Sequence, residues 1–201
     1  SIKIVGKRYV YEKIITVLAS TTVILAGCSG SNSESKGKTL DVELPLKTTS
    51  IAPYETDVPV KIGALESLFK MSKDGKVKPL LVKSFKQKSD DTLTLKIKDD
   101  IHFQNGHKLT GDAVKRSLEQ GVKKSDLLSG SLPIDKITAK GQDVTIKTKE
   151  PYPELKSELA SPFAAIYDTQ AKGKVSDQPV GTGPYQIDKY QRSQKIQQSK
   201  Y

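Results

Sequence analysis

The chain has 201 residues, a formal net charge of +10 and a single cysteine, Cys28. One cysteine excludes a framework of internal disulfides, and the length suits one ordinary domain. The charge does not indicate a nucleic-acid partner, because the lysines stand singly among acidic residues, without the clustered arginines and interleaved aromatic residues of such sites.

The first 27 residues have the three parts of a secretory signal. Cations precede an apolar run at residues 14–26, and this run ends in the small residues Ala26 and Gly27. Hydroxyl side chains interrupt the run, and its 13 residues are fewer than the roughly 20 that span a bilayer. We therefore predict a signal peptide at residues 1–27 that is removed, and not a transmembrane helix.

The tetrapeptide Leu25-Ala26-Gly27-Cys28 resembles the lipobox of bacterial lipoproteins. The resemblance implies that Cys28 carries a diacylglyceryl group and that the mature chain begins at this residue. Two acyl chains, at about 0.8 kcal/mol per buried methylene, hold a protein durably at a membrane. We expect an anchor through Cys28 on the extracytoplasmic face of the cell membrane; an ordinary signal peptide or a buried free cysteine is the alternative.

Residues 28–38 are polar and rich in serine and glycine, a composition that buries too little apolar area to order itself. They are predicted to be a flexible tether to a single domain at residues 39–201. In residues 39–46, apolar and polar side chains alternate with the period of a half-buried strand, and Pro45 favours an edge position. Residues 48–54 should then form a loop.

The next part of the chain predicts a helix and two hairpins. Residues 60–69 place apolar side chains at helical spacing, and residues 72–77 contain an Asp-Gly turn. Residues 84–88 and 92–98 flank Ser89-Asp90-Asp91, and the apolar side chains of the second segment face one side, which is typical of a hairpin.

Asn105-Gly106 is a strong signal for a tight turn between residues 101–103 and 107–109. Thr110 or Gly111 is placed to cap the helix that follows. Strands at residues 134–139 and 144–148 frame a turn at Gly141-Gln142. The remaining expected elements are strands at residues 185–190 and 195–201 and a short helix at residues 153–160.

The most informative internal pattern lies at residues 79–118. It contains, in order, Pro79-Leu80-Leu81, Phe85, Asp90-Asp91, the alternating Leu93, Leu95 and Ile97, then Lys98-Asp99, Phe103, Asn105-Gly106 and Asp112-Ala113-Val114. This order resembles the signature region of the extracellular solute-binding proteins of family 5, the peptide/nickel class that delivers ligands to ABC importers. Phe85 and Gly111 depart from the commoner Trp and Ala, which changes the volume of these residues but not the pattern.

A second match is Pro179-Val180-Gly181-Thr182-Gly183-Pro184-Tyr185, which in the family leads into a strand. We interpret this element as structural, with glycines that permit unusual backbone angles and a proline that stiffens the start of the strand. A phosphate-binding loop is disfavoured, because the downstream Lys-Ser/Thr pair and the helix of such loops do not follow.

The resemblance covers residues 40–201, and residues 45–57 are similar to nickel-binding members from Gram-positive bacteria. It implies a mixed α/β fold, namely the amino-terminal lobe of a type II periplasmic-binding-protein-like fold with mixed sheets and short helices. Family members are usually more than twice as long, so the resemblance also implies a truncated chain whose second lobe is missing.

The function implied by the resemblance is that of a substrate-binding lipoprotein of an ABC importer. Such a protein captures nickel chelates or short peptides and presents them to permease and ATPase subunits. It needs no cofactor of its own, since a nickel chelate is cargo. The alternative is a non-transport surface lipoprotein that acts as an interaction or structural module.

By the same resemblance, Tyr54 and Phe163 are candidate ligand contacts on segments that border the cleft. A surface aromatic residue in a loop is an equally good interpretation of Tyr54. At the position of Phe163, some nickel-chelate or opine binders place an arginine that holds a ligand carboxylate. Phenylalanine there favours an apolar wall or core packing instead.

The sequence predicts neither a metal site nor a catalytic site. His102 and His107 flank a tight turn without a third ligand, which favours surface histidines over a nickel site. The chain has no Gly-x-Ser-x-Gly nucleophile elbow, and Glu150, Glu154 and Glu158 suit the solvated face of a helix. We therefore expect a binding protein and not an enzyme.

Overall fold

The computed structural model describes residues 39–43, 49–191 and 195–201. The predicted signal peptide, the tether and Cys28 lie outside the described residues, and so do the last residues of the strand predicted at 39–46. Within the described ranges, antiparallel strands are combined with short helices, which agrees with the predicted mixture of sheet and helix.

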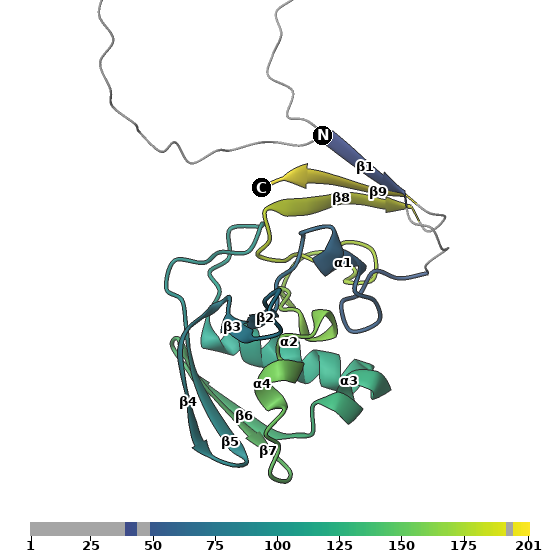
Figure 1. Ribbon diagram of the computed structural model, residues 1–201. Coiled ribbons are helices and arrows are strands. Elements are labelled where there is room, and N and C mark those ends of the chain that lie inside the picture. Colours follow the sequence, from purple (N-terminus) through teal and green to yellow (C-terminus); the bar gives the residue numbers. More distant parts are fainter. Residues whose placement is uncertain (1–38, 44–48, 192–194) are drawn as a thin grey trace, which may run out of the picture.

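The described part of the chain contains three antiparallel sheets (Figure 1). The largest has the strand order β4-β5-β7-β6, a second has the order β1-β9-β8, and β2 and β3 form a hairpin. The strands are β1 Thr39–Glu43, β2 Phe69–Met71, β3 Val77–Pro79, β4 Val82–Ser89, β5 Thr92–Ile97, β6 Ile134–Lys140, β7 Asp143–Thr148, β8 Tyr185–Gln191 and β9 Lys195–Lys200. The helices are α1 Val58–Lys61, α2 Gly111–Lys124, α3 Asp126–Ser131, α4 Leu155–Glu158 and the 3-10 helix η1 Pro162–Ala164.

The four-stranded sheet packs its apolar face against α2, which contacts β6 and β7. In β5 the buried residues Leu93, Leu95 and Ile97 alternate with less buried ones, which confirms the predicted one-sided strand. Val144 and Ile146 of β7 continue this buried layer. The three-stranded sheet lies at the other end of the molecule, beyond α1 in the view of Figure 1.

The start of α2 agrees with the sequence. Thr110 is the N-cap, and its Oγ1 accepts a hydrogen bond from the N–H of Ala113 at 3.2 Å. Gly111 donates its own N–H to the carbonyl of Gly141 at 2.8 Å, and a Cβ on Gly111 would lie only 2.8 Å from that oxygen. Thr110 is thus the cap, whereas Gly111 permits the close approach of α2 to the turn between β6 and β7.

The four predicted tight turns are confirmed. Three of them connect β2 with β3, β4 with β5, and β6 with β7. The fourth, Asn105-Gly106, reverses the chain between His102 and Lys108, which pair as an isolated bridge. Gly106 has a φ of 87°, a left-handed conformation in which glycine is favoured. Local turn chemistry therefore sets these reversals.

The helix predicted at residues 60–69 is wrong. The helix α1 ends at Lys61, and Gly63 turns the chain with a φ of 73°. Beyond Gly63 the chain is extended, because Glu66 pairs with Ile166 in an isolated bridge and Phe69 begins β2. The apolar side chains of this stretch are buried by partners that are distant in sequence, and not by the packing of one helix face.

Two smaller differences concern the helices. The helix α3 is not predicted by the sequence pattern; it is a short helix whose N-cap Ser125 accepts a hydrogen bond from the N–H of Leu128 at 3.2 Å. Glu150 precedes α4, so the predicted row of three glutamates does not lie on one helix. No helix within the described ranges is long and apolar enough to cross a membrane.

Candidate functional site

Five segments that are distant in sequence meet between the two larger sheets, and we call this region the junction. Backbone hydrogen bonds join the segments. The N–H of Ile51 donates to the carbonyl of Ser176 at 2.8 Å, and the N–H of Asp168 donates to that of Val180 at 2.8 Å. The junction consists of residues 49–57, 63–68, 103–107, 161–168 and 176–185.

The Gly-Thr-Gly-Pro element of the junction crosses an earlier backbone segment at close range. Gly183 donates its N–H to the carbonyl of Ala64 at 3.1 Å, and Tyr185 donates to that of Gly63 at 3.2 Å. A Cβ on Gly183 would overlap the carbonyl oxygen of Gly63. Neither Gly181 nor Gly183 has a positive φ, so the prediction that they permit unusual backbone angles is wrong. Glycine is required here because a side chain would separate the two backbones.

The side chain of Gln104 holds this crossing together. Its Nε2 lies 2.8 Å from the carbonyl oxygen of Ala64, 3.0 Å from that of Gly183 and 2.6 Å from that of Tyr185. Its Oε1 accepts a hydrogen bond from the N–H of Gly181 at 3.0 Å. One amide group thus joins the Asn105-Gly106 turn to both crossing segments. No local pattern signals this role, because all four partners are at least 40 residues away.

Tyr54 is buried within the junction, with only 7% of its surface exposed. The centre of its ring lies 6.1 Å from that of Tyr167, and the two ring planes are tilted by 53°. Burial, and then the negative charge of Glu55, raise the pKa of Tyr54, so its phenol is neutral near pH 7. The interpretation of Tyr54 as a surface aromatic residue is therefore wrong, whereas its role as a ligand contact stays a prediction.

Phe163 lies in η1 and is partly buried against the core. Ser161 caps this turn, since its Oγ accepts a hydrogen bond from the N–H of Phe163 at 3.3 Å. The carbonyl of Ser161 accepts a hydrogen bond from the hydroxyl of Ser67 at 2.8 Å, which ties η1 to the segment that precedes β2. Partial burial suits both predicted roles of Phe163, the apolar wall and core packing. The ring beside Tyr54 is that of Tyr167, not Phe163.

A polar cluster of Asn105, His107 and Asp168 lies at the edge of the junction. The side chain of Asp168 is only 3% exposed. Its Oδ2 lies 2.8 Å from Nδ2 of Asn105 and 2.7 Å from Nδ1 of His107, and its Oδ1 accepts a hydrogen bond from the N–H of Gln170 at 2.9 Å. A carboxylate can only accept, so the imidazole of His107 carries a proton on Nδ1. His102 is exposed and takes no part in this cluster.

Burial alone would raise the pKa of Asp168, but the hydrogen bonds from Asn105, Gln170 and His107, with the charge of His107, outweigh it and lower the pKa. The stabilisation by this carboxylate is therefore present above its unfolded pKa of about 3.9 and is lost as the pH falls through the lower folded value. We expect Asp168→Asn to lower the free energy of unfolding at pH 7 by about 1–3 kcal/mol and to flatten its decline below about pH 4.

Urea unfolding between about pH 2.5 and 7 would measure both effects. Asp99→Asn is the matched control, because Asp99 and its partner Lys83 are more than half exposed and lie 3.2 Å apart at the surface. Equal losses of unfolding free energy in the two variants would show that the buried cluster stabilises the fold no more than an exposed ion pair does.

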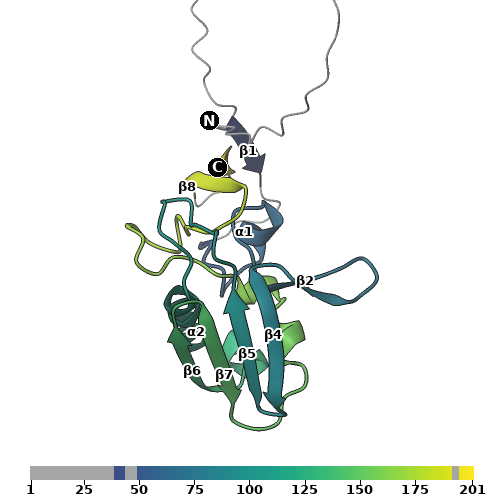
Figure 2. The same cartoon turned by 90° about the vertical axis from the view of Figure 1, so that its left-hand side faces the viewer.

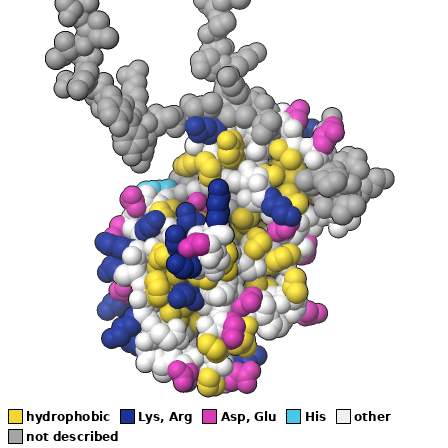
Figure 3. Space-filling view, viewed as in Figure 1, with side chains coloured by type: hydrophobic (Ala, Val, Ile, Leu, Met, Phe, Trp, Pro, Cys, Tyr) yellow, Lys and Arg dark blue, Asp and Glu magenta, His cyan; other side chains and the backbone are white. Residues whose placement is uncertain are grey.

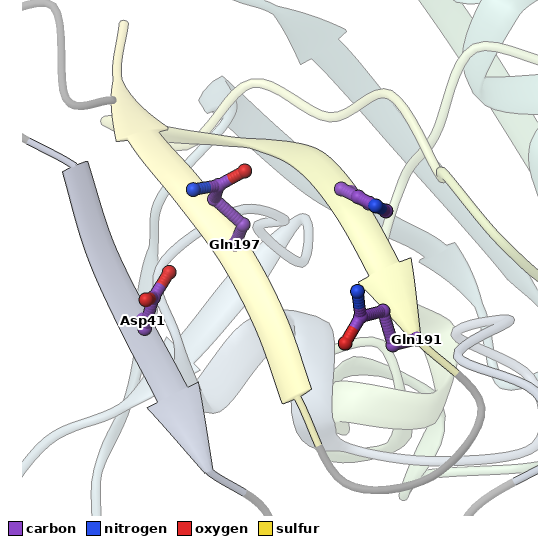
Figure 4. Close-up of a pocket in the computed structure, with 4 residues that line it drawn as sticks. Asp41, Gln191 and Gln197 are labelled. Atoms are coloured by element: carbon purple, nitrogen blue, oxygen red, sulfur yellow. The ribbon is translucent and has the colours of Figure 1, made fainter.

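Among the residues that the structure describes, no group of three or more His, Cys, Asp or Glu side chains is placed to hold a metal ion. A hollow of about 350 Å³ lies on the three-stranded sheet and is lined by Asp41, Lys189, Gln191 and Gln197 (Figure 4). Asp41 and Gln197 are register partners, and Figure 4 shows both on the same side of the sheet. All four of these residues carry polar or charged side chains, unlike the mostly hydrophobic and aromatic residues that line small-molecule sites.

Residues 76–201 match the family described as "Bacterial extracellular solute-binding proteins, family 5 Middle". The chain belongs to family 5. The match includes the Gly-Thr-Gly-Pro element and the segment at residues 79–118 that resembles the family signature. The family prediction is therefore confirmed.

Curated members of family 5 extend the match to nearly the whole chain. The nickel-binding protein NikA of Staphylococcus aureus (strain NCTC 8325) is 58% identical over 191 residues, which cover 95% of this chain and 38% of NikA. The glutathione-binding protein GsiB of Escherichia coli K12 is 25% identical over 209 residues, which cover 96% of this chain and 40% of GsiB. The chain thus spans well under half the length of these relatives.

Solved structures of family 5 members confirm the predicted fold. The crystal structure of S. aureus NikA in complex with Ni(L-His)2 has a TM-score of 0.75 and 65% identity, covering 76% of this chain and 33% of that one. The nickel ABC transporter structure from Bacillus halodurans has a TM-score of 0.74 and 33% identity, covering 78% of this chain and 33% of that one. The described residues therefore adopt part of a type II periplasmic-binding-protein fold.

Proposed function

We propose that the chain is the amino-terminal part of a substrate-binding protein that captures nickel chelates for an ABC importer. One observation carries this proposal, namely the 58% identity to a nickel-binding protein over 95% of the chain. The same observation favours nickel chelates over short peptides as cargo, because the glutathione-binding relative is only 25% identical.

In this proposal the junction provides one wall of a cleft. The segments of Tyr54 and Phe163 are held by hydrogen bonds from distant parts of the chain, so the wall exists before ligand arrives. A neutral phenol and an apolar ring suit the organic surface of a chelate, whose own ligand atoms hold the metal. Capture would then draw a second lobe onto the first, and the closed state would be presented to the permease.

The anchor, the location and the remaining partners belong to the same proposal. Residues 1–27 are a signal peptide, Cys28 carries the lipid, residues 28–38 are the tether and residues 39–201 belong to the amino-terminal lobe. The protein then works at the extracytoplasmic face of the membrane beside permease and ATPase subunits. The mass of membrane-extracted protein tests the anchor: a Cys28→Ala variant should lack the acyl groups, and an unmodified thiol in the parent would refute it.

Thermal unfolding of the full chain with and without Ni(L-His)2 tests the cargo. A ligand that binds only the folded state stabilises it by RT ln(1 + [L]/Kd), about 2.7 kcal/mol at a hundredfold excess over Kd. We expect a saturable rise in Tm with the chelate and none with histidine alone or glutathione. A cooperative transition that the chelate does not move would contradict the proposal and favour the surface-module alternative.

Phe163→Ala separates the two roles of Phe163 in the same experiment. If the ring forms the wall of the cleft, the variant should lose most of the rise in Tm caused by the chelate, beyond the fall in Tm without ligand that its partial burial implies. If the ring only packs on the core, the Tm without ligand should fall and the rise caused by the chelate should be unchanged.

A further inference from the structure

The face of the four-stranded sheet that points away from α2 is polar throughout. We call it the outer sheet face, and Figure 2 looks onto it with α2 behind the strands. None of its residues is buried. The strand registers arrange it in three rows, which are Ser84, Lys96, Asp143 and Lys140, then Lys86, Thr94, Thr145 and Thr138, then Thr92, Lys147 and Lys136.

The outer sheet face carries five lysines and a single aspartate. In the space-filling view of Figure 3, Lys and Arg side chains gather along the left-hand side of the molecule, where this sheet lies. Asp143 lies 3.8 Å from the ammonium of Lys96, but both side chains are well exposed, so this ion pair neutralises little.

Two of these lysines stand directly opposite each other in the sheet. Lys136 and Lys147 are direct register partners on neighbouring strands. Like charges directly opposite each other destabilise an antiparallel pair. Lys147 also lies 3.9 Å from Oδ2 of Asp91, but more than half of its side chain is exposed, so this ion pair offsets little of the repulsion. The remaining positive charge suits a partner outside the chain.

The lysines are close enough to act together. Neighbouring strands lie about 4.8 Å apart and alternate residues about 6.8 Å apart, so the three rows span about 14 Å in each direction. Neighbouring lysines on this grid lie about 5–10 Å apart, which is close to one Debye length of about 8 Å at physiological ionic strength. A shallow hollow of about 370 Å³ on the face is lined by Lys86, Lys88 and Lys96 together with polar neighbours that include Asp143, and parts of three apolar residues, Phe85, Leu95 and Val144, also border it. The hydroxyl of Thr94 already donates to the carbonyl of Lys86 at 3.0 Å, so the lysine ammonium groups are the donors for phosphate oxygens here.

We propose that the outer sheet face docks electrostatically onto the anionic phospholipid headgroups of a membrane. The open sheet presents its lysines in one layer, which fits a plane of phosphates better than a small anion that needs an enclosed pocket. The three rows contain no aromatic side chain on which a nucleic-acid base could stack. They contain no apolar side chain either, so the contact is peripheral and weakens with salt. It does not depend on the lipid proposed at Cys28.

Vesicle sedimentation tests this proposal with the full chain and variants that all keep residues 1–38 unchanged. The vesicles contain phosphatidylcholine with or without about 30% phosphatidylglycerol, which gives them the negative surface potential of an anionic leaflet. One variant, called the outer-face variant, carries K86Q, K136Q and K140Q in the three rows and K88Q at the hollow on this face. The matched control carries K123Q, K124Q, K172Q and K174Q, which remove the same charge from exposed lysines outside the outer sheet face.

We expect the outer-face variant to bind anionic vesicles about 100- to 1,000-fold more weakly than the parent, and the control variant to bind within about threefold of it. Both variants should bind phosphatidylcholine vesicles like the parent and keep its Tm. If both variants bound anionic vesicles equally weakly, net charge alone would explain the binding and the proposal would be overturned. The proposal would also be overturned if the outer-face variant bound vesicles like the parent but bound soluble polyphosphate more weakly. The partner would then be a phosphate polymer.

Discussion

Gly183→Ala is expected to lower the free energy of unfolding by about 3 kcal/mol or more. The new methyl group would overlap the carbonyl oxygen of Gly63 and lie 2.8 Å from the carbonyl carbon of Ala64. Both neighbours are backbone atoms, which cannot rotate away as a flexible side chain can. The two segments would have to separate, and the hydrogen bond from Gly183 to Ala64 would be lost with the one from Tyr185 to Gly63.

Urea unfolding would measure this loss, with Gly130→Ala as the matched control. Gly130 lies in α3, and nothing lies within 4 Å of a Cβ placed on it. Alanine favours a helix over glycine, so the control should be stabilised by up to about 1 kcal/mol. A loss below about 1 kcal/mol for Gly183→Ala would mean that the crossing can relax, and glycine would then not be needed for close packing.

Features that are encoded within a few neighbouring residues can be predicted from the sequence. The turns at Asn105-Gly106 and Gly141-Gln142 are predictable because turn residues act through their own φ and side-chain chemistry. The cap at Thr110 is predictable for the same reason. The one-sided burial of β5 follows from simple alternation. In each case the residues that determine the local structure lie within a few residues of one another in the sequence.

Features that depend on distant partners cannot be predicted in this way. The spacing of Leu65 and Leu68 suits a helix, but Gly63 and the bridge between Glu66 and Ile166 force an extended chain. Nothing in the neighbours of Tyr54 along the chain indicates its burial against a second tyrosine. Sequence reasoning misses the buried carboxylate of Asp168, because its side-chain donors come from a turn more than 60 residues earlier.

The outer sheet face gathers charges that are dispersed along the sequence. Along the chain the lysines stand singly, which indicates no basic cluster. Alternate residues of a strand share a face, so pairing gathers lysines from four strands into one layer. The acidic residues of the same segments fall mostly at turns, and only Asp143 stands in the layer itself, while Asp91 reaches Lys147 from a turn. The charge pattern thus becomes visible only once the registers are known.

Gln104→Leu is expected to lower the free energy of unfolding by about 2–4 kcal/mol. Leucine has a similar volume but no polar atoms, so the N–H of Gly181 loses its acceptor and the carbonyls of Gly183 and Tyr185 lose a donor. Gly181 is buried, and water cannot replace the lost partner there without opening the crossing. Amide hydrogen exchange at residues 181–185 should therefore accelerate more than exchange in the four-stranded sheet.

Gln87→Leu provides the control, because Gln87 is exposed and its Nε2 donates only to the carbonyl of Ser89, two residues away. Its effect should stay within about 0.5 kcal/mol. If Gln104→Leu also stayed within that limit and left exchange at residues 181–185 unchanged, the backbone hydrogen bonds and the two glycines alone would hold the crossing. A large loss confined to Gln104→Leu would instead make the turn at residues 104–107 part of the support of the proposed cleft wall, because the same turn contacts Asp168 through Asn105.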